Sequence, residues 1–485
     1  MRGRVLDVLG RSRDDRLAAL AVVIGLLGIV VVWLARPDRG GDTGPLQTGS
    51  EALSRCLAEL DLVHCTSGGP IDPFPVLQHL PDMAGHVAGL SVDGRTRLLA
   101  ALSALGVVVA VAAAWIVLRR IGLPEWRWGF LLVAASGPTL AYGNTTWAEM
   151  LATGLVTLLV AAAVLPARPA LVGLAAFGAG ITKESGYIFV AALALVALLL
   201  ARRRGGCSVR RHIVFGGAGL GFAIAVGAGL NVIRYGTPRN AYYLDPGFRT
   251  TTVEKAFELG AGLFVAPNGG ILAFWPLATI VVGLLLVVPL ARAARGASSW
   301  REAWPALALF AVVAGLTAAL ALWWAPFGWW AWGPRLSLPW VLPILLVAVA
   351  AFGSALSPLL ARVLTPVAGL VGVAILVVVA ALPHVGLLWR PRTIGDFFFR
   401  AETAACPGGG PPPTPEYYDC LGERMWTRHP ILLDALGGVG TPGGIVTVAL
   451  VTLVVVGCLV RFRGEAAERL SRPRGRSAPP GSSAR

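Results

Sequence analysis

The chain has 485 residues, of which 56% are hydrophobic and only 14% are charged, and its mean hydropathy is +0.71. Ordinary globular domains carry about a quarter charged residues, so this composition excludes a soluble protein. The net charge of +15 does not indicate a nucleic-acid-binding protein, because the basic residues gather in alternate connections between apolar segments.

Apolar segments long enough to form membrane-crossing helices follow one another along the chain. A helix needs about 20 apolar residues to cross the hydrocarbon core, where its backbone amides must be satisfied within the segment. The predicted spans are 17–35, 98–118, 128–142, 147–165, 170–181, 186–201, 213–233, 270–291, 304–324, 336–352, 366–382 and 444–460. The third, fifth and sixth are short and could be tilted, broken or partly re-entrant. The sequence therefore predicts an all-α polytopic membrane protein with about twelve transmembrane helices.

The basic residues indicate how these helices are oriented. Residues 1–16, 119–127, 166–169, 202–212, 292–303, 353–363 and 461–485 together hold 25 basic and 7 acidic residues, and the rest of the chain holds 16 and 19. The excess of positive charge places these segments, and both termini, in the cytoplasm.

This orientation defines the expected domain organisation. The long connections 36–97, 234–269 and 383–443 lie outside, within a single transmembrane domain that covers residues 1–460. Residues 461–485 are basic and rich in Pro, Ser and Gly, so a disordered cytoplasmic tail is expected there.

Four cysteines fall in the predicted outer loops. Cys56 and Cys65 share the first loop, and Cys406 and Cys420 share the last. Disulfides persist in oxidising compartments outside the cytosol, so the predicted bridges are Cys56–Cys65 and Cys406–Cys420. Four unpaired thiols are the alternative.

Three motifs at outer helix ends resemble family signatures. Residues 231–243 are NVIRYGTPRNAYY, residues 262–276 are GLFVAPNGGILAFWP, and residues 323–339 are WWAPFGWWAWGPRLSLP. They are similar to the R-F/Y-G-S/T-P, G-L-L/F-x-S/A-P-x-x-G and W-x-W-G-P-R-x-x-x-P signatures of bacterial polyprenyl-phosphate-dependent glycosyltransferases with the GT-C fold. The resemblance covers most of the chain, in order.

The resemblance implies an integral-membrane glycosyltransferase in the bacterial plasma membrane. Such an enzyme moves a sugar from a polyprenyl-phosphate donor to a polysaccharide, glycolipid or glycoprotein acceptor at the outer face, with inversion at the sugar. Some of these transferases use a divalent cation, which is therefore a candidate cofactor. His64, His79 and His86 lie in the first outer loop, but hard cations prefer oxygen ligands, so these histidines are interpreted as scattered loop residues.

Arg335 is the strongest candidate for holding the donor phosphate. It follows a Trp-rich run and a Gly-Pro break at the outer mouth of a predicted helix, and a planar guanidinium suits phosphate oxygens. The alternative is an interfacial arginine whose side chain reaches out to the lipid headgroups. Arg234, Arg239 and Lys183 are further candidates for phosphate binding.

The general base is expected among the acids of the first outer loop. The family places its acid shortly after the first helix and before an amphipathic segment that lies on the membrane. Residues 50–62 fit that segment, because Leu53, Leu57 and Leu60 share one helical face. Asp42 precedes this segment at a suitable spacing, and Asp38 is the second candidate. A solvated loop residue is the alternative for either acid.

Further candidate site residues stand at other outer helix ends. Glu149 is either a site residue or an ordinary N-terminal acid favoured by the helix dipole. Glu184 either belongs to the site or neutralises Lys183 in a tight turn. Trp332 is either part of an interfacial aromatic belt or a stacking surface for sugar or isoprenoid. Tyr243 ends the first of the three motifs.

Two other classes of protein are alternatives to a transferase. A polytopic lipid or solute transporter often shows internal repeats and charged residues near the midplane of its helices. Here no repeat is evident, the helix centres are nearly free of charge, and polar residues gather at outer helix ends. A non-catalytic membrane scaffold is the third interpretation. The many Arg and Trp residues at outer helix ends argue against it.

Overall fold

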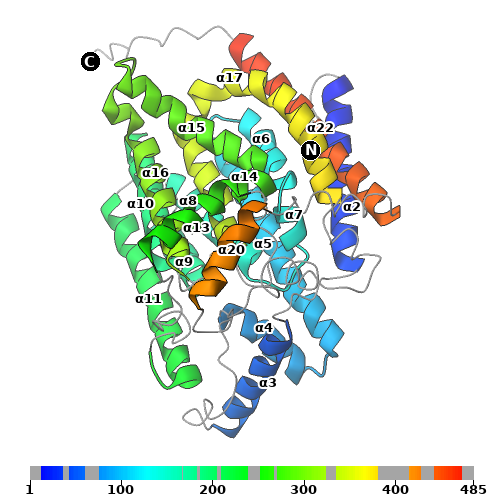
Figure 1. Ribbon diagram of the computed structural model, residues 1–485, viewed down its shortest axis with the longest axis vertical. Coiled ribbons are helices and arrows are strands. Elements are labelled where there is room, and N and C mark those ends of the chain that lie inside the picture. The colour runs from blue at the N-terminus through cyan, green and yellow to red at the C-terminus, as the bar shows by residue number, and fades with distance from the viewer. Residues whose placement is uncertain are drawn as a thin grey trace, which may run out of the picture.

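The elements of the computed structural model are helices (Figure 1). It describes residues 13–35, 43–60, 76–165, 168–182, 186–204, 209–238, 252–266, 270–323, 335–380, 414–427 and 442–471. The elements are α2 Arg13–Ala35, α3 Thr43–Glu59, α4 Val76–Val87, α5 Val92–Arg120, α6 Glu125–Ala135, α7 Thr139–Tyr142, α8 Glu149–Val164, α9 Pro169–Thr182, α10 Tyr187–Arg203, α11 Val209–Tyr235, α13 Val253–Val265, α14 Ile271–Phe274, α15 Pro276–Ala294, α16 Trp300–Ala321, η3 Arg335–Ser337, α17 Leu338–Ala380, α20 Pro415–Thr427 and α22 Pro442–Ser471.

Several helices have the length and composition of membrane spans. Within the described residues, five such segments are Val92–Arg120, Val209–Ile233, Pro276–Ala294, Trp300–Ala321 and Arg335–Val363. The helices Glu149–Val164 and Pro169–Thr182 are apolar but shorter. Large apolar side chains remain exposed along these helices, as expected where lipid replaces water. The chain is an integral membrane protein, and the full set of twelve spans stays a prediction.

The third predicted span, residues 128–142, is broken into α6 and α7. Pro138 has no amide hydrogen with which to continue the helix. Gly137 leaves room for the indole of Trp275, because a Cβ at position 137 would lie 2.2 Å from Trp275 Nε1. That nitrogen donates a hydrogen bond of 2.8 Å to the carbonyl oxygen of Val133, at the end of α6. The break is therefore shaped by the packing of a distant tryptophan.

The same tryptophan divides the eighth predicted span, residues 270–291. Trp275 separates α14 from α15 with a non-helical backbone, and Pro276 is the first residue of α15. A proline is favoured at this position, because the amide at the start of a helix has no intrahelical acceptor. Two predicted spans are thus interrupted at one contact.

Helices extend into two segments that were expected to lie outside the predicted spans. The inner loop expected at 353–363 is helical, since α17 continues from Leu338 to Ala380, and in Figure 1 this helix turns over at the top of the bundle. The disordered tail expected from residue 461 is helical as far as Ser471, because α22 continues and buries Phe462 and Ala466. Apolar contacts with neighbouring helices thus extend regular structure beyond what charge and composition indicate.

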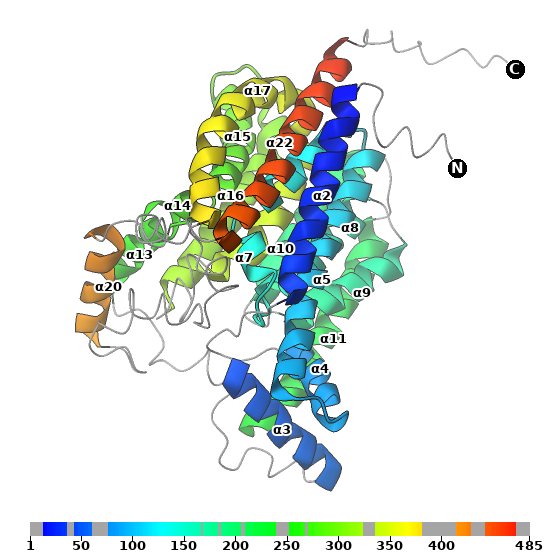
Figure 2. The same cartoon turned by 90° about the vertical axis from the view of Figure 1, so that its right-hand side faces the viewer.

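Ionic contacts bring both described ends of the chain to one end of the bundle, here called the terminal end. Asp15 of α2 lies 3.3 Å from Arg461 of α22. Arg469 of α22 lies 2.6 Å from Glu125, the first residue of α6. Glu125 also accepts a hydrogen bond of 2.9 Å from Ser357 of α17. The opposite end of the bundle, called the loop end, carries α3 and α4 (Figure 2).

Arg95 organises the loop end. Its guanidinium forms a two-pronged contact with Asp82 of α4, at 2.9 and 2.5 Å, and lies 2.5 Å from Glu51 of α3. It also donates a hydrogen bond of 3.0 Å to the backbone carbonyl of Gln47. The hydrogen bond from Arg95 lowers the pKa of Glu51, so this contact stabilises the loop end at neutral pH and weakens as acidification protonates the carboxyl. One buried arginine thus joins α3 and α4 to the start of α5.

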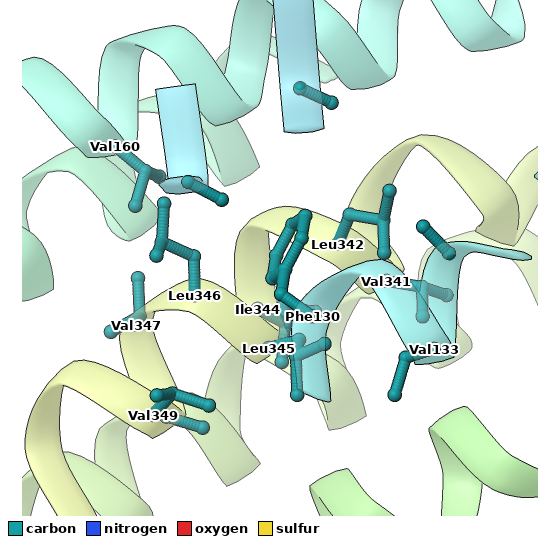
Figure 3. Packing of buried hydrophobic residues seen from close by; sticks show 14 of the residues in the cluster. Phe130, Val133, Val160, Val341, Leu342, Ile344, Leu345, Leu346, Val347 and Val349 are labelled. Carbon is teal, nitrogen blue, oxygen red and sulfur yellow. The ribbon is translucent and has the colours of Figure 1, made fainter. Parts of the chain in front are cut away.

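The middle of the bundle is an apolar core around α8. Figure 3 shows Phe130 of α6 beside Leu342 and Leu345 of α17, and Val160 of α8 near Leu346 of the same helix. The α8 helix also packs against α5, α9 and α10. The α8 helix is therefore central to the bundle, with α5, α9, α10 and α17 packed around it.

Two glycines allow α5 and α8 to approach each other at their backbones. A Cβ on Gly106 of α5 would lie 2.1 Å from the carbonyl oxygen of Met150, and a Cβ on Gly154 would lie 2.5 Å from the carbonyl oxygen of Gly106. Small residues at helix contacts are a common means of association in membranes, where close packing replaces the hydrophobic effect.

We expect Gly106→Ala to destabilise the protein by about 1–3 kcal/mol, because the added methyl group overlaps the backbone of α8. Gly283→Ala in α15 is the matched control, since outside its own helix no atom of the described residues lies within 4 Å of the added Cβ. The control should be more stable than the unmodified protein by up to about 1 kcal/mol, because alanine has a higher helix propensity than glycine. Unfolding of the detergent-solubilised proteins measures both, and equal stability of the two variants would contradict the close approach.

Candidate functional site

Arg335 lies at the loop end, where η3 begins, and contacts the segment that leads into α8. Its guanidinium carbon is 4.7 Å from the centre of the Trp147 ring, and its Nε is 3.5 Å from Glu149 Oε1. The side chains of Arg335 and Glu149 are 11% and 6% exposed, so the contact is screened from solvent. The structure thus brings together two candidate residues that are 186 positions apart in the sequence.

The chain between α7 and α8 places Trp147 and Glu149. Ser103 of α5 donates a hydrogen bond of 2.7 Å to the carbonyl of Trp147. The Trp147 ring packs against Tyr142, with 5.3 Å between the ring centres. Glu149 is the first residue of α8, after an N-cap residue, Ala148, that gives no side-chain capping bond. The carboxylate therefore meets both the positive end of the helix dipole and the guanidinium of Arg335.

The start of α3 is attached to this same segment. Thr43 Oγ1 lies 2.8 Å from Thr146 Oγ1, and both side chains are buried. Thr146 immediately precedes Trp147, and Thr43 immediately follows Asp42 in the sequence. Asp42 itself lies outside the described residues.

The chain before α8 carries several buried polar residues. Asn144, Thr145 and Thr146 are at most 6% exposed, and Thr139 is 1% exposed. Thr145 donates a hydrogen bond of 2.9 Å to the carbonyl of Tyr142. Polar side chains are rarely buried in an apolar bundle without a structural or functional reason. These residues were not predicted from the sequence, although the run NTT between two apolar segments was a signal for them.

Most of the other predicted site residues fall outside the part of the chain that the structure describes. The backbone of Arg234 lies in the last turn of α11, but its side chain is not among those described. Outside the described residues lie Asp38, Lys183, Glu184, Arg239, Tyr243 and Trp332. Their roles stay predictions.

Among the described residues there is no group of three His, Cys, Asp or Glu side chains that could hold a metal ion. His79 is buried, and its Nδ1 lies 2.8 Å from Ser50 Oγ, whereas His86 is exposed. The hydrogen bond between His79 and Ser50 joins α4 to α3. His64 lies outside the described residues.

Two of the four loop cysteines are described, Cys56 in α3 and Cys420 in α20, and both are disulfide-bonded. Their predicted partners, Cys65 and Cys406, lie outside the described residues, so the pairing itself stays a prediction. Cys458 of α22 is a free thiol buried among apolar side chains.

Two solved structures of ArnT from Cupriavidus metallidurans match the chain. Against the structure bound to undecaprenyl phosphate the identity is 17%, over 93% of this chain and 77% of the other, with a TM-score of 0.48. Against the apo structure the identity is 15%, over 92% and 76% of the two chains, with a TM-score of 0.49. No family model and no curated protein matches the chain. The function therefore has to be inferred from the chain's own residues.

Glu149→Gln removes the charge that faces Arg335, and we expect it to destabilise the folded protein by about 1–3 kcal/mol, because a screened guanidinium loses its carboxylate. Glu254→Gln is the matched control: it removes an exposed acid from the first turn of α13. The control should cost no more than the dipole contribution, about 0.3–1 kcal/mol. Unfolding in mixed detergent micelles measures the stability of both variants. Equal losses of stability would show that Glu149 acts only as an ordinary N-terminal acid.

Proposed function

We propose that this protein is a GT-C-type glycosyltransferase of a bacterial plasma membrane. It transfers a sugar from a polyprenyl-phosphate donor to an acceptor in the cell envelope, with inversion at the sugar. Both termini lie in the cytoplasm, and the loop end faces outside. The single observation that supports the proposal most is the contact of Arg335 with Glu149 and Trp147, beside the anchored start of α3.

Arg335 binds the donor phosphate in this proposal. A guanidinium has five N–H donors, so it can hold one carboxylate and one phosphate at the same time. Glu149 and the Trp147 ring position it: the carboxylate faces Nε, and the ring supports the flat face of the group. A cation held in a poorly hydrated place stabilises charge on a leaving phosphate without reorganising during the reaction.

Asp42 takes the acceptor proton. The acceptor oxygen attacks the anomeric carbon as its proton passes to the Asp42 carboxylate, and the bond between that carbon and the phosphate oxygen breaks. The polyprenyl phosphate leaves with the bonding electrons, and attack opposite to it inverts the anomeric centre. The contact between Thr43 and Thr146 supports this role, because it anchors the residue next to Asp42 near Arg335. Asp38 is the second candidate for the base.

Further residues complete the proposed donor site. Arg234, Arg239 and Lys183 are candidate cations for the phosphate, and Glu184, Trp332 and Tyr243 are candidate contacts for the sugar or the isoprenoid. A divalent cation is a candidate cofactor that would bind the phosphate through oxygen ligands. Their support is the family resemblance of the sequence.

We expect Arg335→Gln to lower the rate of sugar transfer about 10²–10³-fold, as for other preorganised groups that stabilise developing charge. Arg335→Lys should recover little of the lost transfer rate, because an ammonium group lacks the planar pair of donors that a guanidinium offers to phosphate oxygens. Arg97→Gln removes an exposed arginine at the same end of the bundle and should leave the rate unchanged. The measurement is transfer from labelled polyprenyl-phosphate sugars to envelope acceptors by the purified protein. Full activity of Arg335→Gln would contradict the assignment.

Asp42→Asn keeps the shape of the side chain and removes its basicity, so we expect turnover to fall about 10²–10⁴-fold while donor binding is retained. Asp38→Asn is the paired control, and its turnover should stay close to that of the unmodified protein. The assay is single-turnover transfer alongside donor binding. A loss confined to Asp38→Asn would move the base to position 38.

The transporter alternative predicts a different result in the same preparation. A flippase would move the labelled lipid across the bilayer of a vesicle and leave the bond between sugar and phosphate intact. Transbilayer movement without any sugar transfer would therefore refute the proposal.

A further inference from the structure

The C-terminal end of α10 and the first turns of α16 enclose an open pocket at the terminal end of the bundle. It has a volume of about 400 Å³ and is lined by Leu199, Arg202, Arg203 and Trp304. Residues three and four positions apart share one face of a helix, so Leu199 lies one turn below the two arginines. The pocket thus has an apolar side and a basic side.

The two arginines of this pocket carry uncompensated charge. In the described part of the chain, neither Arg202 nor Arg203 forms an ion pair, and both are exposed. The guanidinium carbon of Arg203 lies 5.0 Å from the centre of the Trp304 ring. The neighbouring Arg204 is engaged elsewhere, because it donates to the carbonyl of Ala350 in α17. Glu302, the acid of the same turn as Trp304, is exposed and pairs with neither arginine among the described residues.

The pocket lies where a helix leaves the hydrocarbon. The apolar run of α10 ends at Ala201, and the contact of Arg204 with α17 places this end of α10 at the terminal end, beside Ala350. Tryptophan and arginine are favoured at the level of the lipid headgroups, where ring and stem stay apolar and the polar tip meets water. Basic pockets between membrane helices suit acidic lipid headgroups.

We propose that this pocket binds the phosphate of an anionic phospholipid in the leaflet at the terminal end. The phosphodiester lies between the guanidinium groups of Arg202 and Arg203, whose planar donors match phosphate oxygens. The lipid's acyl chain runs along Leu199 and the apolar face of α10. Trp304 holds Arg203 in place and closes the pocket on the side of α16. This site is separate from the one at the loop end.

The test is lipid binding by the purified full-length protein, measured by native mass spectrometry as the affinity of the first bound lipid. Phosphatidylglycerol should bind more tightly than phosphatidylcholine, and higher salt should weaken only the former. Removing both arginines, Arg202→Gln with Arg203→Gln, should weaken phosphatidylglycerol binding roughly 25-fold, or about fivefold for each charge. Arg120→Gln, an exposed arginine at the end of α5, is the matched control and should change nothing.

Other outcomes would overturn the proposal. Equal affinity of the unmodified protein for the two lipids would refute the proposal. This comparison needs no variant, so the test stays valid if the double variant fails to fold. Unchanged affinity in a folded double variant would remove the arginines from the site. Displacement of the lipid by glycerol 3-phosphate at equal concentration would show a pocket for a soluble phosphate in place of a lipid.

Discussion

The arrangement of the loop end depends on the backbone contact between α5 and α8. Gly106 and Gly154 leave no room for a side chain there, so the two helices are held at one distance and register. One turn before Gly106, Ser103 bonds to the carbonyl of Trp147, and Glu149 begins α8 two residues later. The same close approach therefore fixes the ring and the carboxylate against which Arg335 lies.

The charged contacts named above lie at the two ends of the bundle, and they have different roles there. At the terminal end they form ion pairs between helices, such as Arg469 with Glu125 and Arg461 with Asp15. At the loop end Arg95 holds α3 and α4 in place, while Arg335 is held by a ring and a carboxylate. A charge is costly within the hydrocarbon, so charged groups are best held at the helix ends.

The sequence predicted the helical class and the positions of most helices, because apolar length determines both. Its errors have local causes. The breaks near Pro138 and Pro276 depend on Trp275, whose packing against Gly137 is not visible in the order of residues. The helical continuation past residue 461 depends on apolar contacts that composition does not reveal. Arg335 and Glu149 were each candidates, but their pairing over 186 positions requires the fold.

Binding of a polyprenyl phosphate without a sugar tests the central claim most directly, because it separates phosphate recognition from catalysis. The affinity of the purified protein for this lipid should fall at least tenfold when Arg335 is replaced by glutamine, since a hydrogen-bonded charge contact contributes about 1.5–3 kcal/mol. The exposed Arg97 replaced in the same way should leave the affinity unchanged. Equal affinity of the unmodified protein and Arg335→Gln would contradict the claim that the loop end binds a lipid phosphate through Arg335.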